Sequence, residues 1–187
     1  MKMPRESTRT ASASNRGAAI ARTSRFLALS ALMKTNLSPE RSLDPISHDG
    51  IHDALTFLPA PAYFYEYLYR EIAIIERSRE PLTLIRLMIS PREGNLSIDH
   101  YEISIINFAK ALNRSIRRSD LAARIDRYEF LIAVNNYPKR ATEISRRIFV
   151  LWRDEEFTFS YSSSHHIEGE RALSLLERLD KSKIHVL

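Results

Sequence analysis

The segment SDLAARIDRYEFLIAV, Ser119–Val134, decides the fold because it reads as two short strands joined by a tight turn. Apolar residues on both sides flank a polar break, DRY at 126–128. Residues that tolerate a positive φ make the best hairpin turns, so Asp126 suits the apex and Arg127 does not. The segment therefore predicts an antiparallel hairpin whose arginine and tyrosine need an explanation other than turn propensity.

The chain around this hairpin alternates between helical and extended patterns. Apolar spacing predicts helices over 62–80, 97–118, 138–152 and 168–180, and branched or alternating runs predict strands over 81–90, 155–164 and 183–187. The second helix has a predicted apolar side made of Ile103, Ile106, Phe108, Ala109 and Leu112. This order of elements predicts an α+β domain, in which helices flank a mostly antiparallel central sheet with the hairpin at its centre.

The composition places limits on the class of protein. A chain of 187 residues with 44% apolar residues suits one domain with a sizeable core and an extension. The absence of cysteine excludes disulfides and thiolate metal sites and is compatible with a reducing compartment. No apolar run reaches the roughly 18–20 residues of a membrane span. We therefore expect a cytoplasmic protein with no membrane span.

The net charge of +5 lies in the N-terminal quarter of the chain. Residues 1–45 contain eight Lys or Arg and three Asp or Glu, which leaves twenty of each in residues 46–187. A nucleic-acid-binding domain needs cations clustered on its folded surface, so we expect no nucleic-acid partner. The sequence predicts a basic, flexible extension over 1–45, with a docking helix within 18–34 as the alternative, and a folded domain over 46–187.

Two motifs in the predicted domain resemble the GGDEF family, the diguanylate cyclases. DALTFLP, residues 53–59, resembles the family's D-x-L-T-x-L-P motif, and SDLAARIDRYEF, residues 119–130, resembles its strand and turn SDLVARLGGDEF. The residues at 126–128 stand where the family has Gly, Gly and an acid, and only the following Glu129 and Phe130 match. The resemblance extends to the C-terminus and implies a degenerate member with the family's nucleotidyl-cyclase-like fold.

The resemblance also implies what the substituted positions would do. In this family the glycines let the backbone approach a nucleotide triphosphate, and acids of the hairpin and first strand hold a divalent metal that neutralises phosphoryl charge. Here Met88 and Ser90 stand in the first strand, and Arg127 and Tyr128 stand in the turn. We therefore expect no enzyme activity, no metal and no cofactor. The degenerate active-site positions are Met88, Ser90, Asp126, Arg127, Tyr128 and Glu129, of which Glu129 is expected to be a surface charge.

A second constellation matches the family's inhibitory site, R-x-x-D placed five residues before the turn, where cyclic di-GMP binds. It is supplied by Arg117 and Asp120. A guanidinium forks onto guanine O6 and N7 or onto a phosphate, and a carboxylate accepts from guanine N1–H and N2–H₂. The family's additional arginine from the following helix aligns with Arg147, or with Arg146 one register away. The alternative is an ordinary surface pair of Arg117 with Asp120.

The leading hypothesis is a catalytically inactive GGDEF-like domain, a pseudoenzyme that acts as a bacterial cyclic di-GMP receptor in signalling. Its ligand would bind Arg117, Asp120 and Arg147, with a protein partner that the N-terminal segment contacts and a possible ligand-linked dimer. The rival is a nucleotide-free pseudoenzyme scaffold for protein contacts. A third hypothesis is residual GTP binding, or catalysis with unusual metal ligands. The counterpart of a family lysine near the C-terminus stays open between Lys181 and Lys183.

Overall fold

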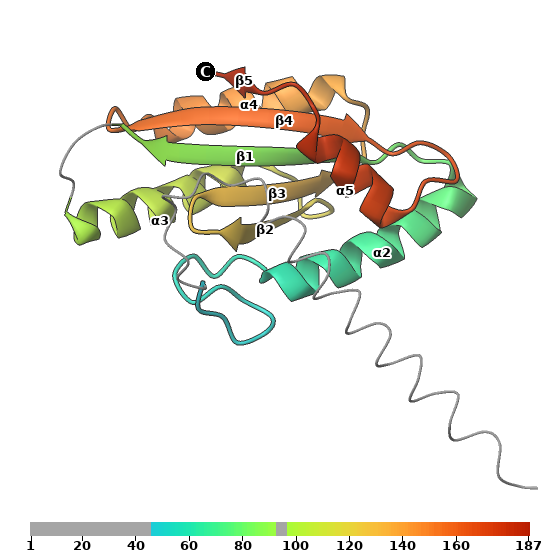
Figure 1. Cartoon of the computed structure of the whole chain (residues 1–187), viewed down its shortest axis with the longest axis horizontal. Helices are drawn as coiled ribbons and strands as arrows, with labels where there is room; N and C mark the ends of the chain where they lie inside the picture. Colours follow the sequence, from blue (N-terminus) through green and yellow to red (C-terminus); the bar gives the residue numbers. More distant parts are fainter. Residues whose placement is uncertain (1–45, 93–96) are drawn as a thin grey trace, which may run out of the picture. The chain divides into compact units, whose positions relative to one another are not determined.

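A computed structural model of the chain describes residues 46–92 and 97–187 (Figure 1). The predicted extension over 1–45, and its alternative helix within 18–34, lie outside these ranges. The helices are α2 (Pro61–Ser78), α3 (Ile98–Ser115), α4 (Lys139–Trp152) and α5 (Ala172–Asp180). The strands are β1 (Thr83–Pro91), β2 (Leu121–Asp126), β3 (Glu129–Val134), β4 (Phe157–His165) and β5 (His185–Val186). None of the helices in the described ranges is long and apolar enough to cross a membrane.

The five strands form one sheet in the order β2-β3-β1-β4-β5, and each neighbouring pair is antiparallel. The central strand is β1, which pairs with β4 along its whole length and with β3 from Thr83 to Met88. The β2–β3 hairpin lies at one edge, so the expectation of a hairpin at the centre of the sheet is wrong. The buried β1 strand takes the centre because its side chains are covered on both faces.

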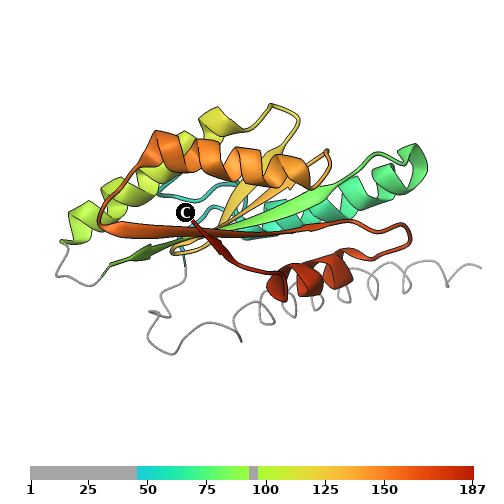
Figure 2. The ribbon, with the colours of Figure 1, turned by 90° about the horizontal axis from the view of Figure 1, so that it is seen from above.

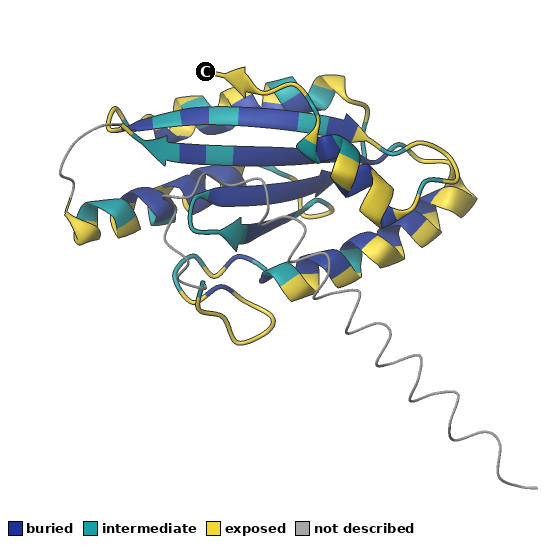
Figure 3. Ribbon diagram, in the orientation of Figure 1, coloured by how far each residue is buried: buried dark blue, intermediate teal, exposed yellow. Residues whose placement is uncertain are grey.

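Helices cover both faces of this sheet, and Figure 2 shows α3 and α4 side by side on one face with α5 on the other. Alternate strand residues, such as Ile85 and Leu87 of β1 and Phe130 of β3, point into the core under α3 and α4. Phe108 of α3 lies against Phe130 there, with the ring centroids 4.7 Å apart. Helix α2 contacts β2 and α5. Strands β1 and β3 are accordingly buried along most of their length (Figure 3).

The buried stripe of α3 differs from the predicted one. Ile103, placed on the apolar side from the sequence, is 58% exposed, whereas Ser104 and Ile105 are buried. The Trp152 indole N–H of α4 donates to the Ser104 carbonyl at 3.1 Å. The side of α3 that packs against α4 therefore includes Ser104 and not Ile103.

The hairpin turn consists of Arg127 and Tyr128, and neither residue has a positive φ. The register shifts between Arg124 and Asp126, which is a bulge in β2. A bulge bends and twists the strand locally, so this turn closes without a left-handed residue. The Asp126 carboxylate accepts from the Arg127 N–H at 2.6 Å. The expected positive φ at the apex is therefore not found.

The DALTFLP motif and the hairpin are joined by a buried ion pair. Asp53 accepts from the Thr56 N–H at 2.8 Å and from the Arg124 guanidinium of β2 at 3.1 Å. Arg124 also donates to the Arg127 carbonyl at 3.0 Å. Asp53 is 1% exposed and Arg124 is 5% exposed. Arg124 therefore holds the turn against the segment that precedes α2.

Phe57 in this motif adopts a left-handed conformation, with φ of 57°, and its side chain is 79% exposed. For a residue with a Cβ atom, this conformation costs about 1–2 kcal/mol of folding free energy. Glycine avoids that steric cost, but its greater loss of conformational entropy on folding costs about 0.5–1 kcal/mol relative to alanine. We expect Phe57→Gly to be more stable than Phe57→Ala by about 1 kcal/mol, because both variants remove the same exposed ring. Urea unfolding followed by circular dichroism measures the difference, and equal stability would contradict a strained backbone at this residue.

Candidate functional site

The R-x-x-D segment forms a closed turn between α3 and β2. The Asp120 N–H donates to the Arg117 carbonyl at 3.1 Å, and the Arg117 N–H donates to Asp120 Oδ2 at 2.9 Å. The Tyr67 hydroxyl of α2 donates to the Ser119 carbonyl at 3.5 Å. Burial and the nearby Glu71 carboxylate raise the pKa of Tyr67 to about 12, so this hydroxyl keeps its proton at neutral pH. The backbone of the turn is thus fixed from both sides.

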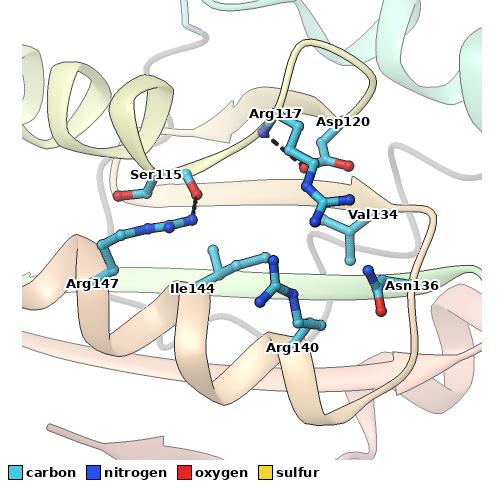
Figure 4. A pocket seen from close by; sticks show the side chains of 8 residues that line it. All are labelled: Ser115, Arg117, Asp120, Val134, Asn136, Arg140, Ile144 and Arg147. Atoms are coloured by element: carbon cyan, nitrogen blue, oxygen red, sulfur yellow. Dashed lines mark hydrogen bonds between the residues drawn. The ribbon is translucent and has the colours of Figure 1, made fainter.

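This turn forms one wall of an open pocket, called here the arginine pocket (Figure 4). Its other walls are the C-terminal end of β3, the loop that follows it, and one face of α4. The lining residues are Ser115, Arg117, Asp120, Val134, Asn136, Arg140, Ile144 and Arg147. All three residues predicted to bind cyclic di-GMP, Arg117, Asp120 and Arg147, therefore line one pocket. Arg146, the alternative one register away, is not among its lining residues.

The three arginines of the pocket differ in their present partners. Arg147 donates from its guanidinium to the Ser115 carbonyl at the end of α3. Arg140 donates to Glu143 Oε2 at 2.7 Å. Arg117 is exposed, and its guanidinium has no hydrogen bond or ion pair within the described part of the chain. The lining residues include three guanidinium groups and one carboxylate, that of Asp120. This excess of positive charge favours an anionic ligand.

Arg140 and Asn136 belong to this pocket, and the motif comparison did not identify them. The signal for Arg140 was available in the sequence, because Arg140, Ile144 and Arg147 follow one another at i, i+4 and i+7. Residues at this spacing lie on one face of a helix. Once α4 is predicted and Arg147 is assigned to a site, Arg140 is placed on the same face two turns earlier.

The positions predicted to form a degenerate active site lie where β1 meets the hairpin. Met88 lies opposite Glu129 of β3 on one side and Ser160 of β4 on the other. Ser90 lies two residues further along β1, opposite Thr158. The register thus brings together Met88 and Glu129, as the family resemblance implies. No cluster of three or more His, Asp or Glu side chains suited to a metal ion occurs in 46–92 or 97–187.

Glu129 is not the surface charge expected from the sequence. It is 3% exposed and forms an ion pair with Arg86 of β1, whose guanidinium also donates to Asp180 Oδ1 of α5 at 2.9 Å. Burial raises the pKa of Glu129, and the charge of Arg86 opposes this rise. Glu129 therefore anchors the hairpin to the central strand and to α5.

The side chains of the turn form a small aromatic and cationic cluster. The Arg127 guanidinium lies 5.5 Å from the centroid of the Tyr128 ring and 6.0 Å from that of Tyr101 in α3. The Tyr128 ring lies 6.2 Å from both Tyr101 and Phe157. A cation within about 6 Å of an aromatic ring is attracted to its face. Arg127 and Tyr128 thus contribute packing between the turn and α3, which explains the two residues at the turn.

The two candidate C-terminal lysines remain without an assigned role. Lys181 follows the last residue of α5, Lys183 lies before β5, and both are exposed. Neither lysine is among the residues that line the arginine pocket, and neither pairs with Met88 or Glu129 in the sheet.

The fold and the paired motifs define an α+β domain of the nucleotide-cyclase class. The family model described as diguanylate cyclase, GGDEF domain matches residues 50–170, and the chain belongs to this family. The comparison with curated proteins gives no match. The predicted family and fold class are therefore confirmed.

Solved structures show the same fold. The GGDEF domain of DgcB from Caulobacter crescentus, in complex with cyclic di-GMP, is 21% identical with a TM-score of 0.60, over 73% of this chain and 90% of that one. A microbial GGDEF domain described for its interaction mode with cyclic di-GMP is 20% identical with a TM-score of 0.61, over 71% and 89%. Diguanylate cyclase SiaD from Pseudomonas aeruginosa, in complex with its activator SiaC, is 21% identical with a TM-score of 0.64, over 90% and 66%.

The family match corrects the expectation that the chain is not an enzyme, because the matched family is that of the diguanylate cyclases. That expectation relied on the side-chain types at a few positions, chiefly Met88, Ser90 and Tyr128. Backbone carbonyls, water and remaining carboxylates also provide oxygen ligands for Mg²⁺, so these side chains alone do not decide the activity.

Proposed function

We propose that this GGDEF domain is a cytoplasmic receptor for cyclic di-GMP, which it binds in the arginine pocket. The observation that carries the proposal is that Arg117 and Asp120 of the loop and Arg147 of α4 line one pocket. The motif spacing predicts Arg117 and Asp120, and the alignment of the following helix predicts Arg147. An ordinary surface pair of Arg117 with Asp120 would not require a third arginine from another element.

The chemistry of the pocket suits a guanine dinucleotide. Arg117 presents a guanidinium that no other described residue engages and that can fork onto guanine O6 and N7, and Asp120 provides a carboxylate for the guanine N–H donors. Val134 and Ile144 provide apolar surface for the face of a base. The excess of guanidinium groups over carboxylates matches the two negative charges of the ligand's phosphodiesters.

Related structures support this ligand and a protein partner. The DgcB domain is seen in complex with cyclic di-GMP, and SiaD is seen in complex with its activator SiaC. Because the arginine pocket is open and Arg117 is exposed, a ligand bound there keeps one face available to a second molecule. We therefore include a protein partner and a ligand-linked dimer in the proposal, with the N-terminal segment as the contact to the partner.

Calorimetric titration of the purified chain tests the proposal. We expect saturable binding of cyclic di-GMP and weaker binding of cyclic di-AMP, by roughly fivefold or more, because adenine lacks the O6 acceptor and the N1–H and N2–H₂ donors. GTP serves as a further comparison, because it shares the base but not the two linked phosphodiesters. A folded wild-type chain that gives no heat with cyclic di-GMP would reject the proposal and favour the scaffold hypothesis.

Asp120→Asn provides a variant of nearly identical shape. The amide presents a donor toward the guanine N–H donors and removes one acceptor, so we expect affinity for cyclic di-GMP to fall by roughly 5- to 20-fold. The hydrogen bond from the Arg117 N–H to this side chain can be kept by the amide oxygen. Titration of both chains measures the loss, and an unchanged affinity would show that Asp120 does not contact the base.

A further inference from the structure

Arg140 is a pocket residue to which neither the family motif nor the proposal above gives a role. It lies in the first turn of α4, and its side chain lines the arginine pocket beside Asn136. Figure 4 shows Arg117 and Arg140 reaching toward each other from opposite walls, across Val134 and Ile144. A ligand on this apolar floor would therefore lie between the two guanidinium groups.

The spacing along α4 gives the pocket two cations on one helix face. Arg140 and Arg147 are separated by two turns, or about 10 Å along the axis, with Ile144 between them. A ligand that spans this face meets a cation at each end and an apolar side chain in the middle. A cyclic dinucleotide, which has two phosphodiesters and two bases, is a ligand of this chemistry.

The surroundings of Arg140 suit a phosphate better than a base edge. The Watson–Crick edge of guanine presents N–H donors beside O6, and Asp120, the lining carboxylate that suits these donors, lies in the turn with Arg117. Arg140 shares the pocket instead with Asn136, whose amide oxygen already accepts from the Tyr137 N–H at 2.9 Å, which leaves the amide nitrogen as a further donor. Two donor groups favour a ligand group that only accepts hydrogen bonds, such as a phosphate.

The present partner of Arg140 is easily exchanged. Its guanidinium donates to Glu143 at 2.7 Å, but the side chains are 38% and 61% exposed. Exposed pairs of this kind contribute little to stability, because water screens them. Glu143 is not among the residues that line the pocket. A phosphate can therefore replace this carboxylate at little cost.

We infer that Arg140 binds a phosphate of the cyclic dinucleotide and that Glu143 competes with the ligand for its guanidinium. The inference rests on the proposed function of the arginine pocket. It adds a phosphate-binding residue and an acidic competitor, and both lie on α4.

Calorimetric titration of four variants with cyclic di-GMP tests the inference. We expect Arg140→Ala to weaken binding by roughly 5- to 20-fold, because it removes a charge-assisted hydrogen bond. Glu143→Ala should tighten binding by about two- to threefold, because it removes a competitor of modest strength. The double variant should bind like Arg140→Ala alone, since Glu143 has nothing left to compete for. Arg146→Ala is the matched control, because it removes the same charge from α4 outside the pocket.

A second ligand separates phosphate binding from base recognition. A phosphate contact is common to both dinucleotides. Arg140→Ala should therefore lower the affinity for cyclic di-GMP and the affinity for cyclic di-AMP by the same factor. Three results would each overturn the inference while leaving the proposed function intact. These are an equal loss of affinity in Arg140→Ala and Arg146→Ala, weaker binding by Glu143→Ala, and a changed ratio between the affinities for the two ligands in Arg140→Ala. Absence of binding by the wild-type chain would overturn both.

Discussion

Replacing Arg86 with methionine should lower the free energy of unfolding at neutral pH by about 3–5 kcal/mol, the usual cost of removing one partner of a buried ion pair. Arg86 is 9% exposed in the central strand, and it pairs with Glu129 of the hairpin and Asp180 of α5. Methionine fills a similar volume but leaves two carboxylates without their cation. Urea unfolding followed by circular dichroism measures the loss.

The pH dependence of this loss has a definite sign. Burial raises the pKa of Glu129 and of Asp180, and Arg86 opposes both rises. Without Arg86 both pKa values should rise further. A carboxyl group with a raised pKa in the folded state supports folding below its unfolded pKa, and this support is lost as pH rises through the folded pKa. The difference between wild type and Arg86→Met should therefore be largest at neutral pH and shrink as pH falls toward about 4.

Two variants make the result interpretable. Arg70→Met removes an exposed arginine that pairs with Glu66 at 3.4 Å, and it should change stability by less than about 1 kcal/mol. Arg86→Met combined with Glu129→Leu should be less destabilised than Arg86→Met alone, because the stranded hairpin carboxylate is also removed. A loss at Arg86 no greater than that at Arg70 would show that the ion pair does not hold the hairpin.

Local patterns predicted the elements of this fold but not their arrangement. The hairpin, the helices and their order follow from apolar periodicity, which depends on neighbours within a few residues. The sheet order depends on which strands pair over long distances, and nothing local distinguished a hairpin at the centre from one at the edge. Ile103 illustrates the same limit, because the side of α3 that meets Trp152 of α4 is set by tertiary packing and leaves Ile103 exposed.

The proximity of the candidate residues follows from the family resemblance. Arg117 and Asp120 are predicted from their spacing to the hairpin turn and Arg147 from the alignment of the following helix, and all three line one pocket, while their role in ligand binding stays a prediction. Glu129 was misinterpreted because its partner, Arg86, is remote in sequence and is reached only through strand pairing. Arg140 lies outside the family motif, and only its position on the same helix face as Arg147 links it to the site.

Arg117→Ala should weaken cyclic di-GMP binding by roughly 5- to 150-fold, because a bidentate guanidinium contact to guanine is worth about 1–3 kcal/mol. Its guanidinium is unengaged in the described part of the chain, so the substitution removes a ligand contact without breaking an internal bond. The hydrogen bond that closes the turn uses the Arg117 backbone N–H, which alanine keeps. The variant should therefore unfold at the same urea concentration as the wild type.

Arg118→Ala is the matched control for this prediction. Arg118 is the next residue of the same turn, is equally exposed and carries the same charge, but its side chain does not line the arginine pocket. General attraction between a basic surface and an anionic ligand would weaken binding equally in both variants. A formed site gives a large loss at Arg117 and little change at Arg118. Loss of preference for cyclic di-GMP over cyclic di-AMP in Arg117→Ala alone would place this guanidinium on the guanine edge, because only a contact to the base distinguishes the two ligands.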